Sequence, residues 1–157
     1  MMRIFFQGGI KQQLTDLAEL VKLLDPDLYA YLDTRYSPKL SHLSKCIDCI
    51  IMFFRESVNF IFCFRWLLIW FKRELAFTDV MRLWEVLWTR KPCTNFHLLI
   101  CVALINDQTA TIVENKFGYS EILKHINDLA NRINLNDVLI KAEAIWLKIR
   151  EVSINKN

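Results

Sequence analysis

Glycine and proline are scarce in this sequence, since each occurs only three times in 157 residues. Tight turns between short strands depend on these two residues, so their scarcity argues against a many-stranded β fold and favours long helices. Hydrophobic residues make up 54% of the chain, above the roughly 45–50% of ordinary soluble domains. We therefore predict an all-α fold with a large core and about six to eight helices.

Blocks of positive charge are also lacking. The net charge is +3 and both signs are mixed along the chain, so nothing in the sequence indicates a nucleic-acid partner. The first ten residues lack the apolar segment of a secretory signal. The longest uncharged run, Pro92–Asn106, is shorter than the roughly 20 residues that a membrane span needs. We expect a cytoplasmic protein with no transmembrane span, and peripheral association with endomembranes stays open.

The cysteines and histidines do not form a pattern that indicates a metal or catalytic site. Zinc sites usually need four ligands, and Cys46-x-x-Cys49 with His42 would supply only three. His97 and His125 have no cysteine or serine partner pattern, so we interpret both as structural. We predict no catalytic residue, no metal and no cofactor. An odd cysteine count without a signal peptide favours reduced thiols, with three of them in the core: Cys63, Cys93 and Cys101.

Hydrophobic periodicity predicts a series of helices. Ile10–Leu24 carries one apolar face and ends at Asp25-Pro26, and a short helix follows from Pro26 to about Thr34. Ser57–Glu74 is apolar nearly all round, which is typical of one buried helix. Thr78 is expected to cap the next helix. We place later helix starts at Thr94 or Asn95, Ser120, and Asn134 or Asn136, with an end near Asp107, a short polar helix to Phe117, and Gly118 at its C-terminal end.

The stretch Phe62–Thr89 is the most informative part of the chain. It concentrates aromatic rings at helical spacing, and we predict that its four tryptophans are core residues. A single charge, Arg65, lies within its apolar run. Because an unpaired buried charge is costly, we predict that Arg65 forms an ion pair with Glu85 or Asp79 of the following helix. The core aromatics are Trp66, Trp70, Trp84 and Trp88.

Several short segments of this sequence resemble segments of a known protein family. In order they are FCFRW, FKREL, MRLWEVLWT, NFHL, EILKHINDL and DVLIKAEA. The residues, order and spacing of these segments are similar to those of the C-terminal half of the TBC domain, the helical domain of Rab GTPase-activating proteins. The resemblance covers Ile10–Arg35 and Asn59–Ile149, and it implies a single partial TBC domain over residues 1–157.

The resemblance implies a role in vesicle trafficking, with a Rab-type small GTPase as partner. In the family, an arginine stabilises charge on the phosphates during GTP hydrolysis and a glutamine orients the attacking water. Both lie in the N-terminal half of the domain, in I-x-x-D-x-x-R and Y-x-Q-G-M patterns. The first pattern does not occur here. Gln7-Gly8-Gly9 is a weak copy of the second, but it directly precedes the helix at Ile10, whereas about forty residues separate the two in the family. We expect a regulator that is inactive alone.

Residues 36–55 depart from the family pattern. Family members pass from the short helix to FCFRW with few residues between, so we predict an insertion of about twenty residues, from translated intron or an alternative exon. Two other functions remain open. The chain could be a non-catalytic helical interaction module, as a truncated isoform or fragment, or a peripheral membrane protein that uses the apolar insertion.

Overall fold

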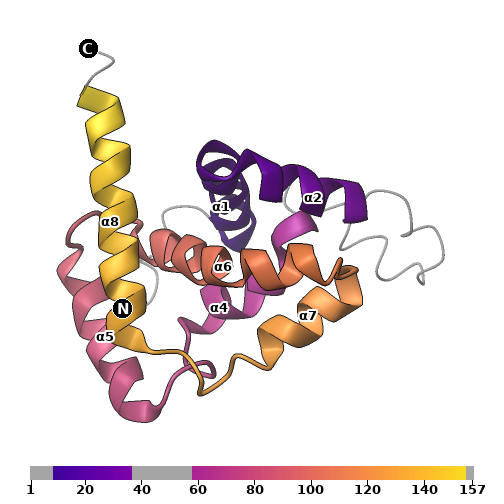
Figure 1. Ribbon diagram of the computed structural model, residues 1–157. Coiled ribbons are helices and arrows are strands. Elements are labelled where there is room, and N and C mark those ends of the chain that lie inside the picture. The colour runs from indigo at the N-terminus through magenta and orange to yellow at the C-terminus, as the bar shows by residue number, and fades with distance from the viewer. Residues whose placement is uncertain (1–8, 37–57, 155–157) are drawn as a thin grey trace.

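The structure, a computed structural model, describes residues 9–36 and 58–154. These residues form seven α-helices and one 3-10 helix, with no strand among them, which confirms the all-α prediction (Figure 1). The predicted insertion at 36–55 lies outside the described residues apart from Tyr36. Cys46, Cys49, His42 and Gln7 lie outside them as well.

Helix α6, Phe96–Glu114, is the centre of the fold. Its first ten residues are all buried, and it packs against α1, α2 and α8. Among the described residues it is the one helix long and apolar enough to cross a membrane, and 61% of its apolar window is buried inside the structure. We predicted a helix end near Asp107 and a separate polar helix to Phe117. That prediction is wrong, because α6 continues through both segments to Glu114.

Helices α1, Ile10–Leu24, and α2, Pro26–Tyr36, cover one side of α6. The predicted bounds of α1 are confirmed. Asp25 caps α2, since its side-chain oxygen accepts a hydrogen bond of 3.0 Å from the Leu28 N–H. The Tyr31 hydroxyl donates a hydrogen bond of 2.9 Å to the Phe117 carbonyl, which ties α2 to the segment after α6.

The predicted single helix Ser57–Glu74 is wrong. The chain forms the 3-10 helix η3, Val58–Cys63, then the short helix α4, Phe64–Ile69. Trp70 and Phe71 then adopt left-handed backbone angles, with φ of 51° and 59°. A continuous α-helix excludes two such residues in succession, so α4 ends there.

Helix α5, Phe77–Thr89, begins one residue before Thr78, and Ala76 takes the N-cap position without a side-chain cap. The prediction that Thr78 is the cap is therefore wrong. The buried residues of α5 are Val80, Leu83 and Leu87. In Figure 1, α5 stands beside the base of α8.

The last two helices are α7, Tyr119–Asn127, and α8, Leu135–Ile154. Gly118 lies at the N-cap of α7, and its N–H donates 2.7 Å to the Glu121 carboxylate, so the predictions of Gly118 as a C-terminal residue and Ser120 as a cap are wrong. Helix α8 has its buried residues in its first half, and its C-terminal end projects beyond the other helices (Figure 1).

Candidate functional site

The turn between α4 and α5, residues 70–76, contains Glu74, one of the three buried polar residues of the described chain, and its Trp70 ring stacks on a second one, His97. Two consecutive left-handed residues without glycine cost roughly 1–2 kcal/mol each, and such strain persists only where the surroundings impose it. Here the Phe71 N–H donates 3.1 Å to the Trp66 carbonyl, and the Asn131 N–H donates 2.8 Å to the Glu74 carbonyl. The turn is thus held from α4 on one side and from the α7–α8 connection on the other.

Arg65 and Glu74 form an ion pair under this turn. Arg65 Nε donates 2.7 Å to Glu74 Oε1, and Nη2 contacts the same oxygen. The Glu74 side chain is fully buried, whereas that of Arg65 is 29% exposed. The second carboxylate oxygen, Oε2, is buried and has no hydrogen-bond partner.

The predicted partner of Arg65 is therefore wrong. Glu85 is an exposed residue of α5, and Asp79 pairs with Arg82 at 3.3 Å. The physical reason is the break at Trp70. A continuous helix would have carried the chain away from Arg65, but the left-handed turn brings Glu74 back to it.

A second buried polar contact joins α1 to α6 beside the same turn. His97 Nε2 lies 3.2 Å from Oε1 of Gln13, and the two side chains are 8% and 5% exposed. The Trp70 ring stacks on the His97 ring, with centroids 5.8 Å apart and an angle of 9° between the planes. Burial lowers the pKa of His97 from 6.5 to about 4, against a smaller upward effect of Asp16. The ring is thus neutral at pH 7, which agrees with the structural interpretation of His97.

The four tryptophans predicted as core aromatics occupy different environments. Trp66 is fully buried, and its Nε1 has no hydrogen-bond partner. Trp70 and Trp84 are partly buried against the core, and Trp84 Nε1 donates 3.0 Å to the Trp70 carbonyl. Trp88 is 52% exposed, so its assignment to the core is wrong. The reason is that Trp88 lies beside the arc of α5 that faces the core, and not within it.

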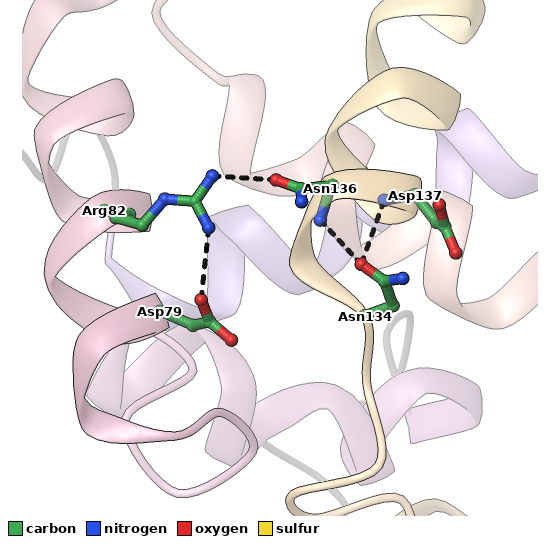
Figure 2. Close-up of polar contacts among 5 residues, drawn as sticks. All are labelled: Asp79, Arg82, Asn134, Asn136 and Asp137. Atoms are coloured by element: carbon green, nitrogen blue, oxygen red, sulfur yellow. Dashed lines mark hydrogen bonds and ion pairs between the residues drawn. The ribbon is translucent and has the colours of Figure 1, made fainter.

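A polar cluster joins α5 to the start of α8 (Figure 2). Arg82 Nη1 donates 3.3 Å to Asp79 Oδ1, while Nη2 donates 2.8 Å to Asn136 Oδ1. Asn134 caps α8, because its Oδ1 accepts from the N–H groups of Asn136 at 3.1 Å and Asp137 at 3.5 Å. Of the two predicted caps, Asn134 fills the role.

The described residues offer little for acid–base, thiol or metal chemistry. In residues 9–36 and 58–154, no three His, Cys, Asp or Glu side chains come together as metal ligands. Burial raises the pKa values of the Cys63 and Cys101 thiols, so both are poor nucleophiles at neutral pH. His125 is partly buried, and its Nε2 lies 2.8 Å from Gln108 Oε1. The polar contacts of the described residues therefore join helices to one another and do not bring together a set of catalytic side chains.

Sequence reasoning missed the Gln13–His97 contact. Gln13 lies next to Leu14 and one turn before Leu17 on the buried face of α1, and His97 lies between two buried apolar residues of α6. A polar residue in a buried register usually has a partner inside the protein. The placement of Gln13 and His97 at buried helix positions was therefore the available signal that each contacts another polar group. It does not identify which group each one contacts.

Comparison with known proteins gives one family and several relatives. A family model described as the Rab-GTPase-TBC domain matches residues 1–113. TBC1 domain family member 17 of Mus musculus is 41% identical over 143 residues, which cover 91% of this chain and 19% of the mouse protein. GTPase-activating protein GYP7 of Debaryomyces hansenii is 38% identical over 146 residues, 93% of this chain and 17% of that protein. GYP7 of Saccharomyces cerevisiae is 33% identical over 146 residues, which cover 93% of this chain and 17% of that protein. The chain thus spans less than a fifth of these relatives.

Proposed function

Because this chain belongs to the Rab-GTPase-TBC domain family, we propose that it acts within the system that stimulates GTP hydrolysis by Rab-type small GTPases in vesicle trafficking. The family match over residues 1–113 carries this proposal. The printed names of the GYP7 relatives, which describe GTPase-activating proteins, support it. We place its action in the cytoplasm, with peripheral association on endomembranes.

We further propose that residues 1–157 correspond to the C-terminal half of the domain and are inactive alone. The order of the words from FCFRW to DVLIKAEA supports this assignment, and I-x-x-D-x-x-R does not occur in the sequence. An arginine supplied to the GTPase raises the hydrolysis rate by about 10³–10⁵. Arg65 does not take that role here, because its guanidinium is committed to the buried Glu74.

A hydrolysis assay tests both parts. Purified Rab-type GTPases loaded with GTP are mixed with the 157-residue chain, and phosphate release is followed over time. Full-length yeast GYP7 is the positive control in the same reactions. We expect the chain to leave the intrinsic rate unchanged. A rate rising in proportion to chain concentration would refute the inactivity, and binding without stimulation would support the family assignment without catalysis.

The second candidate is a non-catalytic helical interaction module. The exposed aromatic side chains of α5 favour it, because Phe77 and Trp88 are 78% and 52% exposed. Such side chains at a surface are typical of protein contact sites. A chain that binds no Rab-type GTPase in the assay above but is captured by a defined protein partner would favour the module.

We propose that residues 36–55 are an insertion in the domain. Messenger RNA reads that join the codon of Arg35 directly to that of Glu56 would support translated intron or an alternative exon. Even coverage through the segment in mature messages would contradict that origin. A peripheral membrane role for the segment predicts that the chain sediments with liposomes and that deletion of 36–55 abolishes this sedimentation.

A further inference from the structure

Three basic side chains at one edge of the molecule have no partner within the protein. The α4–α5 turn carries Lys72 and Arg73, and the α7–α8 connection, residues 128–134, carries Arg132. All three side chains are exposed. Within residues 9–36 and 58–154, none of them forms a hydrogen bond or an ion pair. This edge therefore presents three positive charges to the solvent.

Backbone hydrogen bonds bring these charges together and hold them in place. The Asn131 N–H donates 2.8 Å to the Glu74 carbonyl, so Arg132 lies beside the turn that carries the other two. Within the turn, the Lys72 N–H donates 3.1 Å to the Ile69 carbonyl. Figure 1 shows both connections at the lower edge of the view, next to the N-terminal end of α5. The three charges thus lie on backbone that the fold holds in position.

The acidic side chains at the same edge are mostly neutralised. Glu74 is buried against Arg65, and Asp79 pairs with Arg82. Asp128 is the one acidic residue of the α7–α8 connection. Positive charge is therefore in excess at this edge, and an anionic partner complements it.

The most exposed of the large apolar side chains in the described residues lies at the same edge. Phe77, the first residue of α5, is 78% exposed and follows Arg73 by four residues. An aromatic ring next to basic side chains suits the boundary between the headgroups and the acyl chains of a bilayer. An acidic protein segment would use the charges and leave the ring in water. The combination therefore favours a lipid surface.

We propose that Lys72, Arg73, Arg132 and Phe77, which we call the docking edge, bind to a membrane that contains anionic lipids. The three basic side chains contact the headgroups, and the Phe77 ring enters the interface. Charge attraction and one inserted ring are two weak signals that act together, so the expected binding is peripheral and reversible. The inference rests on the proposed association with endomembranes and names the surface that makes it.

Cosedimentation with vesicles tests the proposal. The full 157-residue chain is mixed at low salt with vesicles of phosphatidylcholine, either alone or with phosphatidylserine added. We expect binding only where phosphatidylserine is present, and weaker binding as salt is raised, because salt screens exposed charges. Lys72→Gln combined with Arg73→Gln is expected to weaken binding at least about tenfold, since each basic residue near an anionic surface contributes about fivefold.

A matched double variant controls for net charge. Lys148→Gln combined with Arg150→Gln removes two exposed positive charges from the C-terminal half of α8, and we expect it to leave binding unchanged within about twofold. Phe77→Ser is expected to weaken binding as well. Ile140→Ser is its control, because Ile140 is 66% exposed on α8 and lies outside the docking edge. Far-ultraviolet circular dichroism and thermal melts confirm that each variant is folded.

A chain that fails to bind phosphatidylserine vesicles at low salt overturns the proposal, and so does equal weakening by the two double variants. Binding that is lost on deletion of residues 36–55 but is unaffected by the change at Lys72 and Arg73 overturns it in favour of the insertion. Capture of the chain by polyglutamate without vesicle binding overturns it in favour of an acidic protein segment. Because vesicle binding needs no GTPase, a chain that binds a Rab-type GTPase but no vesicle overturns this inference and leaves the proposed function standing.

Discussion

Acidification is expected to weaken the fold through His97. Burial lowers the pKa of this ring from 6.5 to about 4, so the unfolded chain binds more protons than the folded chain between these two values. The stability that the neutral ring contributes is complete above pH 6.5. It falls as the pH drops below 6.5, and it is lost once the pH has passed below about 4.

The magnitude follows from the two pKa values. At about 1.4 kcal/mol per pH unit, the difference between 6.5 and about 4 is worth about 3 kcal/mol. The charged groups within reach of the ring are few. Asp16 opposes the shift, and Gln13 and Trp70, the other contacts of the ring, do not titrate in this range.

Urea unfolding followed by circular dichroism at pH 7, 5.5 and 4 measures this effect. The control is His97→Phe, which keeps an aromatic ring beside Trp70 but cannot take up a proton. Carboxylate titration is common to both proteins, so the difference between them isolates the histidine. We expect the wild-type chain to lose about 3 kcal/mol more than the control between pH 7 and pH 4. Parallel pH profiles for the two proteins, or an NMR titration with His97 protonated near pH 6.5, would refute the reasoning.

Further substitutions test the packing around the α4–α5 turn, α5 and α8. Glu74→Leu leaves the Arg65 guanidinium without its carboxylate and is expected to cost about 3 kcal/mol in urea unfolding, and Arg65→Met added to it recovers most of that loss. Trp66→Ala empties a fully buried site and is expected to lower the free energy of unfolding by about 3–5 kcal/mol. Trp88→Ala is expected to lower it by under about 1 kcal/mol, because that ring is 52% exposed. Equal losses in the two variants would contradict the assigned environments. Asn134→Ala removes the cap of α8 and is expected to cost about 1 kcal/mol, with faster amide exchange confined to the first turn of that helix.

The helices that end at strong local signals could be predicted from the sequence. Helix α1 combines a regular apolar face with Asp25-Pro26, which ends it, and its bounds agree with the prediction. Asn134 was one of two residues expected to cap α8, and its side chain makes the capping bonds. These features are determined by residues close together in the chain, so hydrophobic periodicity and capping residues predict them directly.

The candidate site could not be predicted in the same way, because it depends on an unusual turn. Left-handed residues are usually glycine, yet Trp70 and Phe71 are both bulky and aromatic. Nothing local marks the end of α4, so the ion pair of Arg65 with Glu74 followed only from the three-dimensional structure. Trp88 was misplaced for a related reason. The buried residues Val80, Leu83 and Leu87 and the exposed residues Phe77, Met81 and Trp88 both recur at helical spacing, and only the neighbouring helices decide which set is covered.

The apolar character of α6 has a consequence for the newly made chain. Its length and composition meet the requirement for crossing a bilayer, and in the folded protein α1, α2 and α8 pack around it. Before those helices have packed, the segment presents the same apolar surface that membrane-insertion machinery and chaperones recognise. Helix α8 is the last of these partners to be synthesised. Packing of α1, α2 and α8 against α6 therefore removes this apolar surface from recognition as the chain folds.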